Sequence, residues 1–174
     1  MQNVLFPKLD STDKWYVTQE CQYKIVNTEE KLRKLAEYLA RDRFKLISFD
    51  IETNGLVYGE SVVVGCSLAV IPGQAYYIPL NHYDSENNIS LSQLSRWMKP
   101  ILESKAILGH NLKFDYKFFK FCTGISLNVT HDTYVIAKLL EMFDSVALKL
   151  LCASIFNINT IELPSILGQY KLTY

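Results

Sequence analysis

The stretch Phe49-Asp50-Ile51-Glu52-Thr53-Asn54-Gly55-Leu56 places two carboxylates in an otherwise apolar strand. Because strand side chains alternate between two faces, Asp50 and Glu52 point to the same side and their apolar neighbours to the other. The α-carbons of two such residues lie roughly 6.5 Å apart, so both carboxylates can reach one hard cation or a pair of them. Asn54-Gly55 then provides turn chemistry that ends the strand.

The position of this carboxylate pair decides between two interpretations. A short Asp-x-Glu pattern occurs by chance in many sequences, and a pair at a strand end can be merely solvated. The preceding run Leu46-Ile47-Ser48-Phe49 is typical of a central, buried strand. Ionised carboxylates at the end of such a strand need a cation or strong donors to offset their lost hydration. The sequence therefore favours a cation site, with a solvated pair as the alternative.

Composition limits the kind of protein and of nucleic-acid partner. The chain has 174 residues, of which 49% are hydrophobic, so we expect one globular domain with a single core. Lys plus Arg and Asp plus Glu both number 18, which argues against a long basic surface for duplex nucleic acid. A small site that holds a few nucleotides through metals and stacking is still possible. No signal-peptide pattern or membrane-length apolar run is present, so we expect a cytoplasmic protein without a membrane partner.

Cysteines and histidines do not form a recognisable zinc pattern. The four cysteines are widely spaced without a CxxC motif, which favours buried free thiols in a reducing compartment. His82 and His131 fall in predicted loops, and neither has a partner at metal-ligand spacing. Asp132 is interpreted as the N-cap of a helix rather than as a ligand. The cysteines are Cys21, Cys66, Cys122 and Cys152.

The first half of the chain predicts a connector, one helix and four strands. Residues 1–20 carry scattered polar residues and one short apolar patch, which is typical of a leader or a linker. Asn27 followed by Glu30 matches the start of a helix that runs to about Ala40. The last three strands are joined by short turns, including Pro72-Gly73, and form an antiparallel meander. The four predicted strands span residues 22–26, 46–52, 61–70 and 74–79.

The second half of the chain alternates helices and strands. Ser90 with Gln93 forms a capping box, and Pro100 is expected to kink or split the helix that follows. Asn111 and Asp132 each stand where they can cap a later helix. Further strands are predicted at 105–109 and 126–129, another helix at 146–156, and an irregular tail from 157 onward. This order predicts an α/β fold with a mixed sheet and helices on both faces.

A third carboxylate follows one of these strands. Gly109-His110-Asn111-Leu112-Lys113-Phe114-Asp115 joins a strand end to the first turn of a helix, where α/β proteins place their sites. Asp115 lies on the same side of that helix as Asn111, beside an arc of phenylalanines. It is predicted as a third metal ligand, with a plain surface residue as the alternative. The lysines of this helix are Lys113, Lys117 and Lys120. They face away from Asp115, which favours a solvated outer face of the helix over a phosphate-binding site.

Three motifs occur in a specific order: FDIETNGL, then LGHNLKFDYKFF, then HDTYVIAKLL. This arrangement resembles the 3′-5′ proofreading exonuclease domain of family A DNA polymerases, the DNA polymerase I type. The resemblance runs from about Tyr23 to the end, through IPGQAYYIPLNH and TIELPSILGQYKLTY. That family belongs to the DEDD exonucleases, whose ribonuclease H-like fold has a mixed five-stranded sheet. The resemblance therefore implies one exonuclease-like domain over residues 21–174.

The resemblance also implies a site. Asp50, Glu52 and Asp115 match three of the four carboxylates that hold two divalent metal ions, Mg²⁺ or Mn²⁺. Leu56 matches a wedge against the last bases. Phe114 stands where many relatives have tyrosine, and Leu163 stands where an aromatic residue often packs on the terminal base. The positions that match substrate contacts are Thr53, Leu56, His110, Asn111, Phe114 and Leu163.

One family motif has no counterpart in these 174 residues. The third exonuclease motif is a tyrosine followed four positions later by an aspartate, on a helix beyond the other motifs, and no tyrosine stands four positions before Asp132 or Asp144. We therefore expect a domain truncated before its last helix, with weak metal binding. The implied function is hydrolysis of the 3′-terminal phosphodiester of single-stranded DNA by two metals, beside a polymerase domain in the same parent chain. The alternatives are an impaired module that binds DNA ends or acts as a spacer, and an RNA-trimming relative.

Overall fold

The computed structural model describes residues 22–83, 88–141 and 143–158. The predictions for residues 1–20, for Cys21 and for Leu163 fall outside these ranges. The chain divides into two compact units, residues 1–133 and 134–174. The first unit contains the sheet, and the second contains most of α5 (Thr133–Leu140) and all of α6 (Leu148–Phe156). No described helix is long and apolar enough to cross a membrane.

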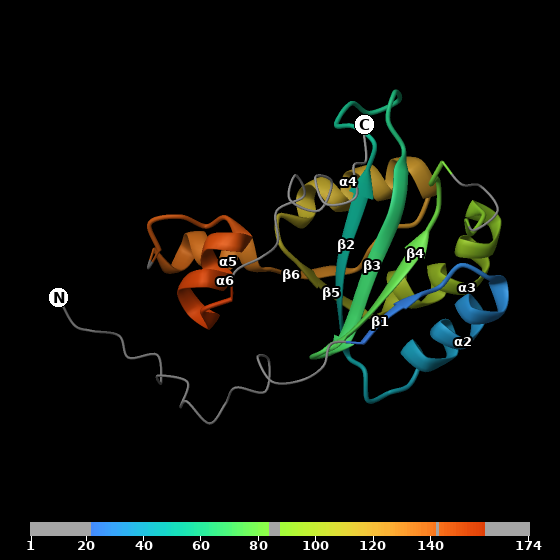
Figure 1. Cartoon of the computed structure of the whole chain (residues 1–174), viewed down its shortest axis with the longest axis horizontal. Coiled ribbons are helices and arrows are strands. Elements are labelled where there is room, and N and C mark those ends of the chain that lie inside the picture. Colours follow the sequence, from blue (N-terminus) through green and yellow to red (C-terminus); the bar gives the residue numbers. More distant parts are fainter. Residues whose placement is uncertain (1–21, 84–87, 142, 159–174) are drawn as a thin grey trace, which may run out of the picture. The chain divides into compact units, whose positions relative to one another are not determined.

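The first unit is built on a mixed six-stranded sheet in the order β1-β4-β3-β2-β5-β6 (Figure 1). The antiparallel meander β2-β3-β4 is confirmed, and the other three pairings are parallel. The family resemblance implied five strands, and this number is wrong because β1 also joins the sheet, beside β4. The strands are β1 (Gln22–Ile25), β2 (Leu46–Thr53), β3 (Val63–Ile71), β4 (Gln74–Pro79), β5 (Ala106–Gly109) and β6 (Val129–Asp132).

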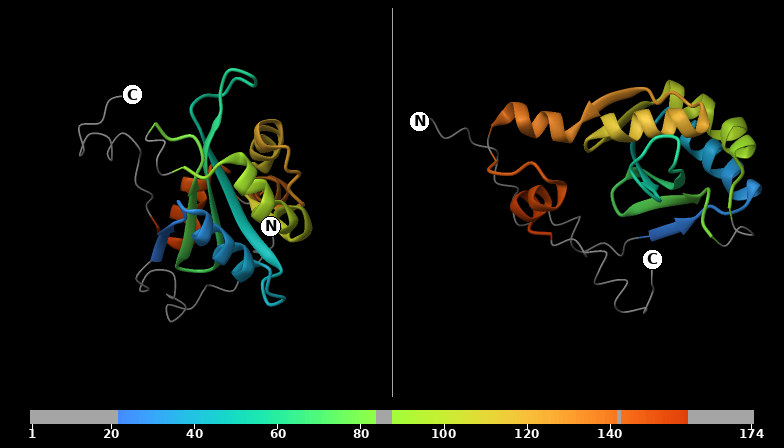
Figure 2. Two further views of the ribbon diagram at one scale, coloured as in Figure 1. Left: turned by 90° about the vertical axis from the view of Figure 1, so that its right-hand side faces the viewer. Right: turned by 90° about the horizontal axis from the view of Figure 1, so that it is seen from above.

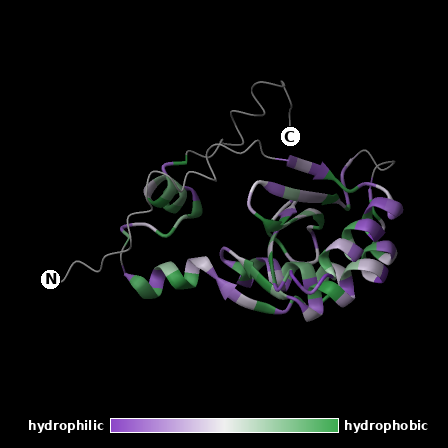
Figure 3. Ribbon diagram, turned by 90° about the horizontal axis from the view of Figure 1, so that it is seen from below, coloured by the Kyte–Doolittle hydropathy of each residue, from purple (hydrophilic) through white to green (hydrophobic). Residues whose placement is uncertain are grey.

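Three helices of the first unit cover one face of this sheet: α2 (Glu29–Leu39), α3 (Leu91–Ser104) and α4 (Leu112–Thr123). Figure 2 shows them gathered on the same side of the strands. Their ribbons alternate between hydrophilic and hydrophobic segments, as amphipathic helices do (Figure 3). The side chains of Ile47, Phe49 and Ile51 on β2 are buried toward these helices, and Phe49 meets Phe119 of α4 with ring centroids 5.1 Å apart.

Two helix predictions need correction. The N-cap of α2 is Thr28 and not Asn27, because the Thr28 hydroxyl accepts from the backbone N–H of Lys31. The capping box of Ser90 and Gln93 is confirmed, but α3 continues unbroken through Pro100. Pro100 is exposed, so the carbonyl that loses its N–H partner faces water rather than the core.

The last strand begins three residues later than predicted. Residues 126–128 were expected to be the start of a strand, yet β6 spans Val129–Asp132. Leu127 is buried in the core, and the Asn128 N–H donates to the carbonyl of Leu102 at 3.0 Å. The segment is therefore tied to α3 before it reaches the sheet. Asp132 is therefore the last residue of β6 and stands immediately before α5.

Candidate functional site

The carboxylates of β2 lie on the sheet face opposite α2, α3 and α4. Along β2, buried and exposed residues alternate, and Asp50 and Glu52 are both on the exposed side, as the sequence predicts. On the neighbouring strand β3, Asp50 is paired with Ser67 and Glu52 with Gly65. The register shifts between Glu52 and Thr53, so the regular pairing of β2 ends just beyond the two acidic residues.

Asp115 is brought to these residues by the first turn of α4. It is only 5% exposed, and it is the one buried polar or charged residue among the described positions. Its Oδ1 accepts a hydrogen bond from the backbone N–H of Ile51 at 3.1 Å. Ile51 stands between Asp50 and Glu52 in the strand. The predicted third carboxylate therefore lies beside the other two, joined to the same segment of β2.

Lost hydration and neighbouring charge both oppose the ionisation of Asp50 and Asp115. Loss of hydration, followed by the charges of Asp115 and Glu52, raises the pKa of Asp50 from 3.8 to about 6. Asp50 as a whole is an exposed residue, but protein atoms partly enclose its carboxyl group. Burial also raises the pKa of Asp115, against the hydrogen bond from Ile51, and the charges of Asp132 and Glu52 add to the rise. The site concentrates negative charge in a poorly hydrated place.

A hard divalent cation fits this chemistry. Carboxylate oxygens are the ligands that Mg²⁺ and Mn²⁺ prefer, and a cation relieves the repulsion that raises the pKa of Asp50. Asp50, Glu52 and Asp115 are the residues that would hold it. Over the ranges that the structure describes, no three His, Cys, Asp or Glu side chains already converge as a finished metal site.

The start of α4 is capped from a different strand. Asn111 was predicted to cap α4, but it has a left-handed backbone conformation, with φ of 61°, and makes no side-chain cap. Instead, the Asp132 carboxylate accepts from the backbone N–H groups of Asn111 and Leu112, each at 2.9 Å. Asp132 caps this helix because β5 and β6 are parallel neighbours that end together at Gly109 and Asp132. The sequence interpretation placed Asp132 at the start of the helix that follows it and did not anticipate this role at α4.

Hydrogen bonds from Thr133 complete this junction between β5 and β6. The Thr133 hydroxyl donates to the carbonyl of Gly109 at 3.1 Å and lies 2.9 Å from Nδ1 of His110. A Cβ atom at Gly109 would meet Leu112 at 2.5 Å, so only glycine allows α4 to begin so close to the strand. Together, Asp132 and Thr133 fix the backbone from which Asn111 and Asp115 project. Sequence analysis missed this function of both residues.

The predicted substrate-contacting residues flank the carboxylates from two segments. The Thr53 hydroxyl donates to the carbonyl of Gly55 at 2.8 Å, in the turn after β2. In the same loop, Leu56 is 74% exposed. Phe114 on α4 is half-buried and packs on Phe118, with ring centroids 5.3 Å apart. Tyr58 also stacks near Phe118, at 4.9 Å, and so ties this loop to α4.

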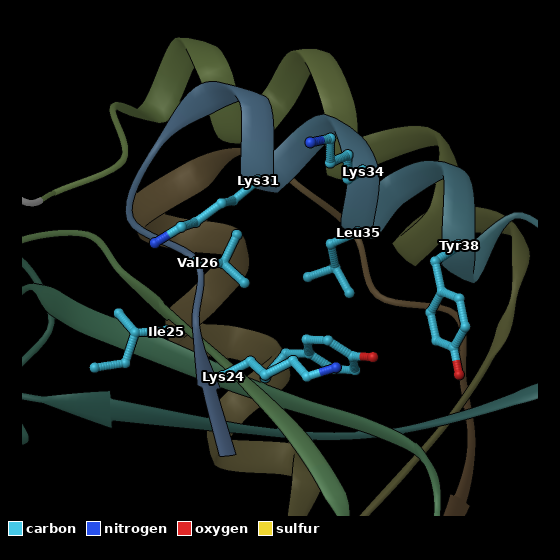
Figure 4. Close-up of a pocket in the computed structure, with 8 residues that line it drawn as sticks. Lys24, Ile25, Val26, Lys31, Lys34, Leu35 and Tyr38 are labelled. Carbon is cyan, nitrogen blue, oxygen red and sulfur yellow. The ribbon is translucent and has the colours of Figure 1, made fainter. Parts of the chain in front are cut away.

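Two basic surfaces are separate from this site. The lysines of α4 are exposed, as predicted for a solvated outer face. A cavity of about 530 Å³ lies between β1, α2 and β4 (Figure 4). Lys31 in this cavity is hydrogen-bonded to Asn27 at 2.7 Å, and Lys34 is paired with Glu30 at 2.7 Å. Its lining is Lys24, Ile25, Val26, Lys31, Lys34, Leu35, Tyr38 and Tyr76, without any of the predicted site residues.

Comparison with known sequences gives one consistent result. Residues 23–169 match the model of a protein family described as 3′-5′ exonuclease. The chain is 34% identical over 119 residues to DNA polymerase I of Pseudomonas aeruginosa, a match that covers 62% of this chain and 13% of that protein. It is 28% identical over 135 residues to DNA polymerase I of Borreliella burgdorferi. This match covers 77% of this chain and 14% of that protein. The chain thus spans a small part of these relatives.

Solved structures with the same fold are more distant in sequence. RNase D of Escherichia coli, an exoribonuclease, superposes with a TM-score of 0.63 at 17% identity, covering 83% of this chain and 36% of that chain. NrnC of Brucella melitensis, solved with bound Mg²⁺, gives a TM-score of 0.57 at 17% identity. The superposition covers 83% of this chain and 65% of that chain. The fold is therefore the ribonuclease H-like exonuclease fold, with six strands in this chain.

Proposed function

The chain belongs to the 3′-5′ exonuclease family that residues 23–169 match, and from this premise we propose that it hydrolyses the 3′-terminal phosphodiester of single-stranded DNA with two divalent metals. The observation that carries the proposal is the carboxylate group on β2 and α4. Asp50 and Glu52 share one open sheet face, and the hydrogen bond from Ile51 holds Asp115 beside them. A nuclease needs such concentrated negative charge to bind metal, and a purely structural strand does not.

The residues of this chain would have two roles, metal binding and positioning of the metal-binding residues. Asp50, Glu52 and Asp115 would hold Mg²⁺ or Mn²⁺, ions that acidify a bound water and stabilise charge on the departing oxygen. The Ile51 N–H fixes one oxygen of Asp115, which leaves its other oxygen for a ligand. Asp132 and Thr133 keep the start of α4 in place, so that Asp115 stays aligned with β2.

The substrate that we propose is an unpaired strand end. The chain has no net charge, so its grip on nucleic acid must come from metals and from stacking rather than from a basic surface. Exposed Leu56 and half-buried Phe114 flank the carboxylates and offer apolar surface to the terminal bases. Thr53, at the end of β2, and Asn111, at the start of α4, provide polar groups for the strand end. The sequence relatives are DNA polymerases, which favours DNA over RNA.

We further propose that this domain serves a polymerase in the same parent chain, as a proofreading exonuclease. The relatives that support this are DNA polymerase I proteins of which the matched region is about one seventh. One observation supports the alternative of an impaired module that binds DNA ends. Among the described residues, no three potential ligands are already arranged around a metal position. The first experiment therefore separates binding from cleavage.

That experiment uses 5′-labelled single-stranded DNA with Mg²⁺ or Mn²⁺. We expect slow, metal-dependent shortening that begins at the 3′ end and disappears in Asp50→Ala. An impaired module would instead show Mn²⁺-dependent DNA binding without shortening, again lost in Asp50→Ala. An RNA strand of the same sequence tests the substrate class, because a preference for RNA would contradict the choice of DNA. Metal-independent behaviour, equal in both proteins, would end the exonuclease proposal.

A further inference from the structure

Tyr77 on β4 faces the same open side of the sheet as the carboxylates. In the register of the meander, Asp50 pairs with Ser67, and Ser67 pairs with Tyr77. Residues that pair across antiparallel strands project their side chains to the same face. These three residues therefore form one row across β2, β3 and β4, strands that lie side by side in Figure 1. A hydroxyl group outside the three ordered motifs thus belongs to the carboxylate face.

The Tyr77 hydroxyl lies over Gly65, which is the strand partner of Glu52. A Cβ atom at Gly65 would stand 2.1 Å from the Tyr77 hydroxyl oxygen and 2.4 Å from its Cζ. The missing side chain of Gly65 therefore creates the space that the phenol ring fills. Because Gly65 and Glu52 are directly paired, the tip of Tyr77 occupies the position next to Glu52. Directly paired residues have Cβ positions roughly 5 Å apart, which a carboxylate spans by rotation.

His82 fixes this hydroxyl from the other side. Nε2 of His82 lies 2.7 Å from the Tyr77 oxygen, and the two rings meet edge to face at 5.6 Å. The His82 backbone is held in turn by Asn88, whose side chain accepts from the His82 N–H at 3.0 Å and donates to its carbonyl at 2.8 Å. The histidine that looked isolated in the sequence thus orients a tyrosine at the carboxylate site.

Electrostatics agrees with this geometry. Burial raises the pKa of Tyr77 to about 12, and the charge of Glu52 is the next contribution, followed by Cys66. The phenol therefore keeps its proton at neutral pH and is influenced by the Glu52 charge. A protonated hydroxyl beside a carboxylate can donate a hydrogen bond to it when the histidine tautomer donates to the phenol oxygen.

We propose that Tyr77, oriented by His82, is a positioning residue that hydrogen-bonds to Glu52 and holds its carboxylate for metal binding. In this arrangement the Nε2–H of His82 donates to the phenol oxygen, and the phenol O–H donates to Glu52. Carboxylates that bind metals are commonly held by such outer partners, whose loss weakens metal binding about 10- to 100-fold. The inference rests on the proposed function. The competing explanation is that the Tyr77 hydroxyl only anchors the loop that follows β4.

The test compares Tyr77→Phe with Tyr76→Phe. Both changes remove one hydroxyl from adjacent residues of β4, but Tyr76 packs against Tyr38, on the helix side of the sheet. Mn²⁺ affinity is measured by calorimetry on the 174-residue chain, together with the thermal unfolding midpoint without metal. We expect Tyr77→Phe to weaken Mn²⁺ binding about tenfold. Tyr76→Phe should leave the affinity within about twofold, and His82→Ala should act in the same direction as Tyr77→Phe.

The outcomes separate this inference from the proposed function. If wild type binds Mn²⁺ and Tyr77→Phe binds it equally well, Tyr77 has no part in the site. In that case, a lower unfolding midpoint in Tyr77→Phe and His82→Ala would assign the pair to anchoring the loop. If wild type binds no Mn²⁺ and Asp50→Ala is indistinguishable from it, both the metal-dependent function and this inference are wrong.

Discussion

Replacing Asp50 with asparagine should stabilise the metal-free protein at neutral pH and remove its response to Mn²⁺. Asparagine has nearly the shape of a protonated aspartic acid but carries no charge. In the folded protein, lost hydration and two neighbouring carboxylates raise the pKa of Asp50 from 3.8 to about 6. Ionisation of Asp50 at neutral pH therefore lowers the free energy of unfolding, and asparagine removes this destabilisation.

The sign and size of the effect follow from the pKa shift. Since the folded protein binds this proton more tightly than the unfolded chain, the linked stability is complete below pH 3.8 and is lost as pH rises through about 6. A shift of about two units corresponds at most to about 3 kcal/mol, and solvent screening at this partly exposed carboxylate reduces it to about 1–2 kcal/mol. The variant should exceed wild type by that amount at neutral pH and match it at about pH 4.

Urea denaturation followed by circular dichroism measures this difference at both pH values. A matched control is Asp42→Asn, because Asp42 is an exposed aspartate in the turn before β2. Mn²⁺ at ten times its dissociation constant should add about 1.4 kcal/mol to the free energy of unfolding of wild type and nothing to that of Asp50→Asn. The reasoning would be refuted by a variant less stable than wild type at neutral pH without metal, or by equal stabilisation of both proteins by Mn²⁺.

Two further substitutions test the packing that supports the site. Asp132→Ala removes the acceptor of two N–H groups at the start of α4, so its free energy of unfolding should fall by about 1–2 kcal/mol in urea, with faster amide exchange at Leu112. Asp42→Ala is the control, and an equal loss there would contradict the capping role. Phe119→Ala should cost about 3–5 kcal/mol, because Phe119 is fully buried against β2. Phe121→Ala, in the same helix but 61% exposed, should cost about 0.5 kcal/mol or less, and similar losses for both would exclude this packing.

The parts of the fold that were predictable depend on local patterns. Alternation along β2 is a property of consecutive residues, so the shared face of Asp50 and Glu52 could be derived without any tertiary information. The short turn at Pro72-Gly73 likewise makes β3 and β4 neighbours, and Gly73 has the positive φ of 76° that such a turn requires. The capping box at Ser90 is a contact over three residues. These features need only local geometry.

The features that were wrong or missed depend on residues distant in sequence. Asn111 is a reasonable cap by residue type, but Asp132 takes that role from 20 and 21 positions away, through the parallel pairing of β5 and β6. A strand at residues 22–26 was predicted, but its place in the sheet depends on pairing between β1 and β4, which are separated by a helix and two strands. His82 looked uninformative because spacing reveals metal ligands, whereas its partner here is a tyrosine on the preceding strand. One useful signal was available: parallel strands that end together bring their last residues into contact.

Asp115 shows why the carboxylate group is better explained by function than by folding. Its hydrogen bond from the Ile51 N–H would be accepted equally well by the side-chain carbonyl of an asparagine, without burying a charge. The carboxylate is nonetheless 5% exposed, near Glu52 and Asp132, where each neighbouring charge opposes its ionisation. A protein stabilised only by packing gains nothing from this arrangement, because buried charges without a partner are costly. A divalent cation would supply that partner, so the charge repulsion at the metal-free site and the proposed metal binding would have the same physical cause.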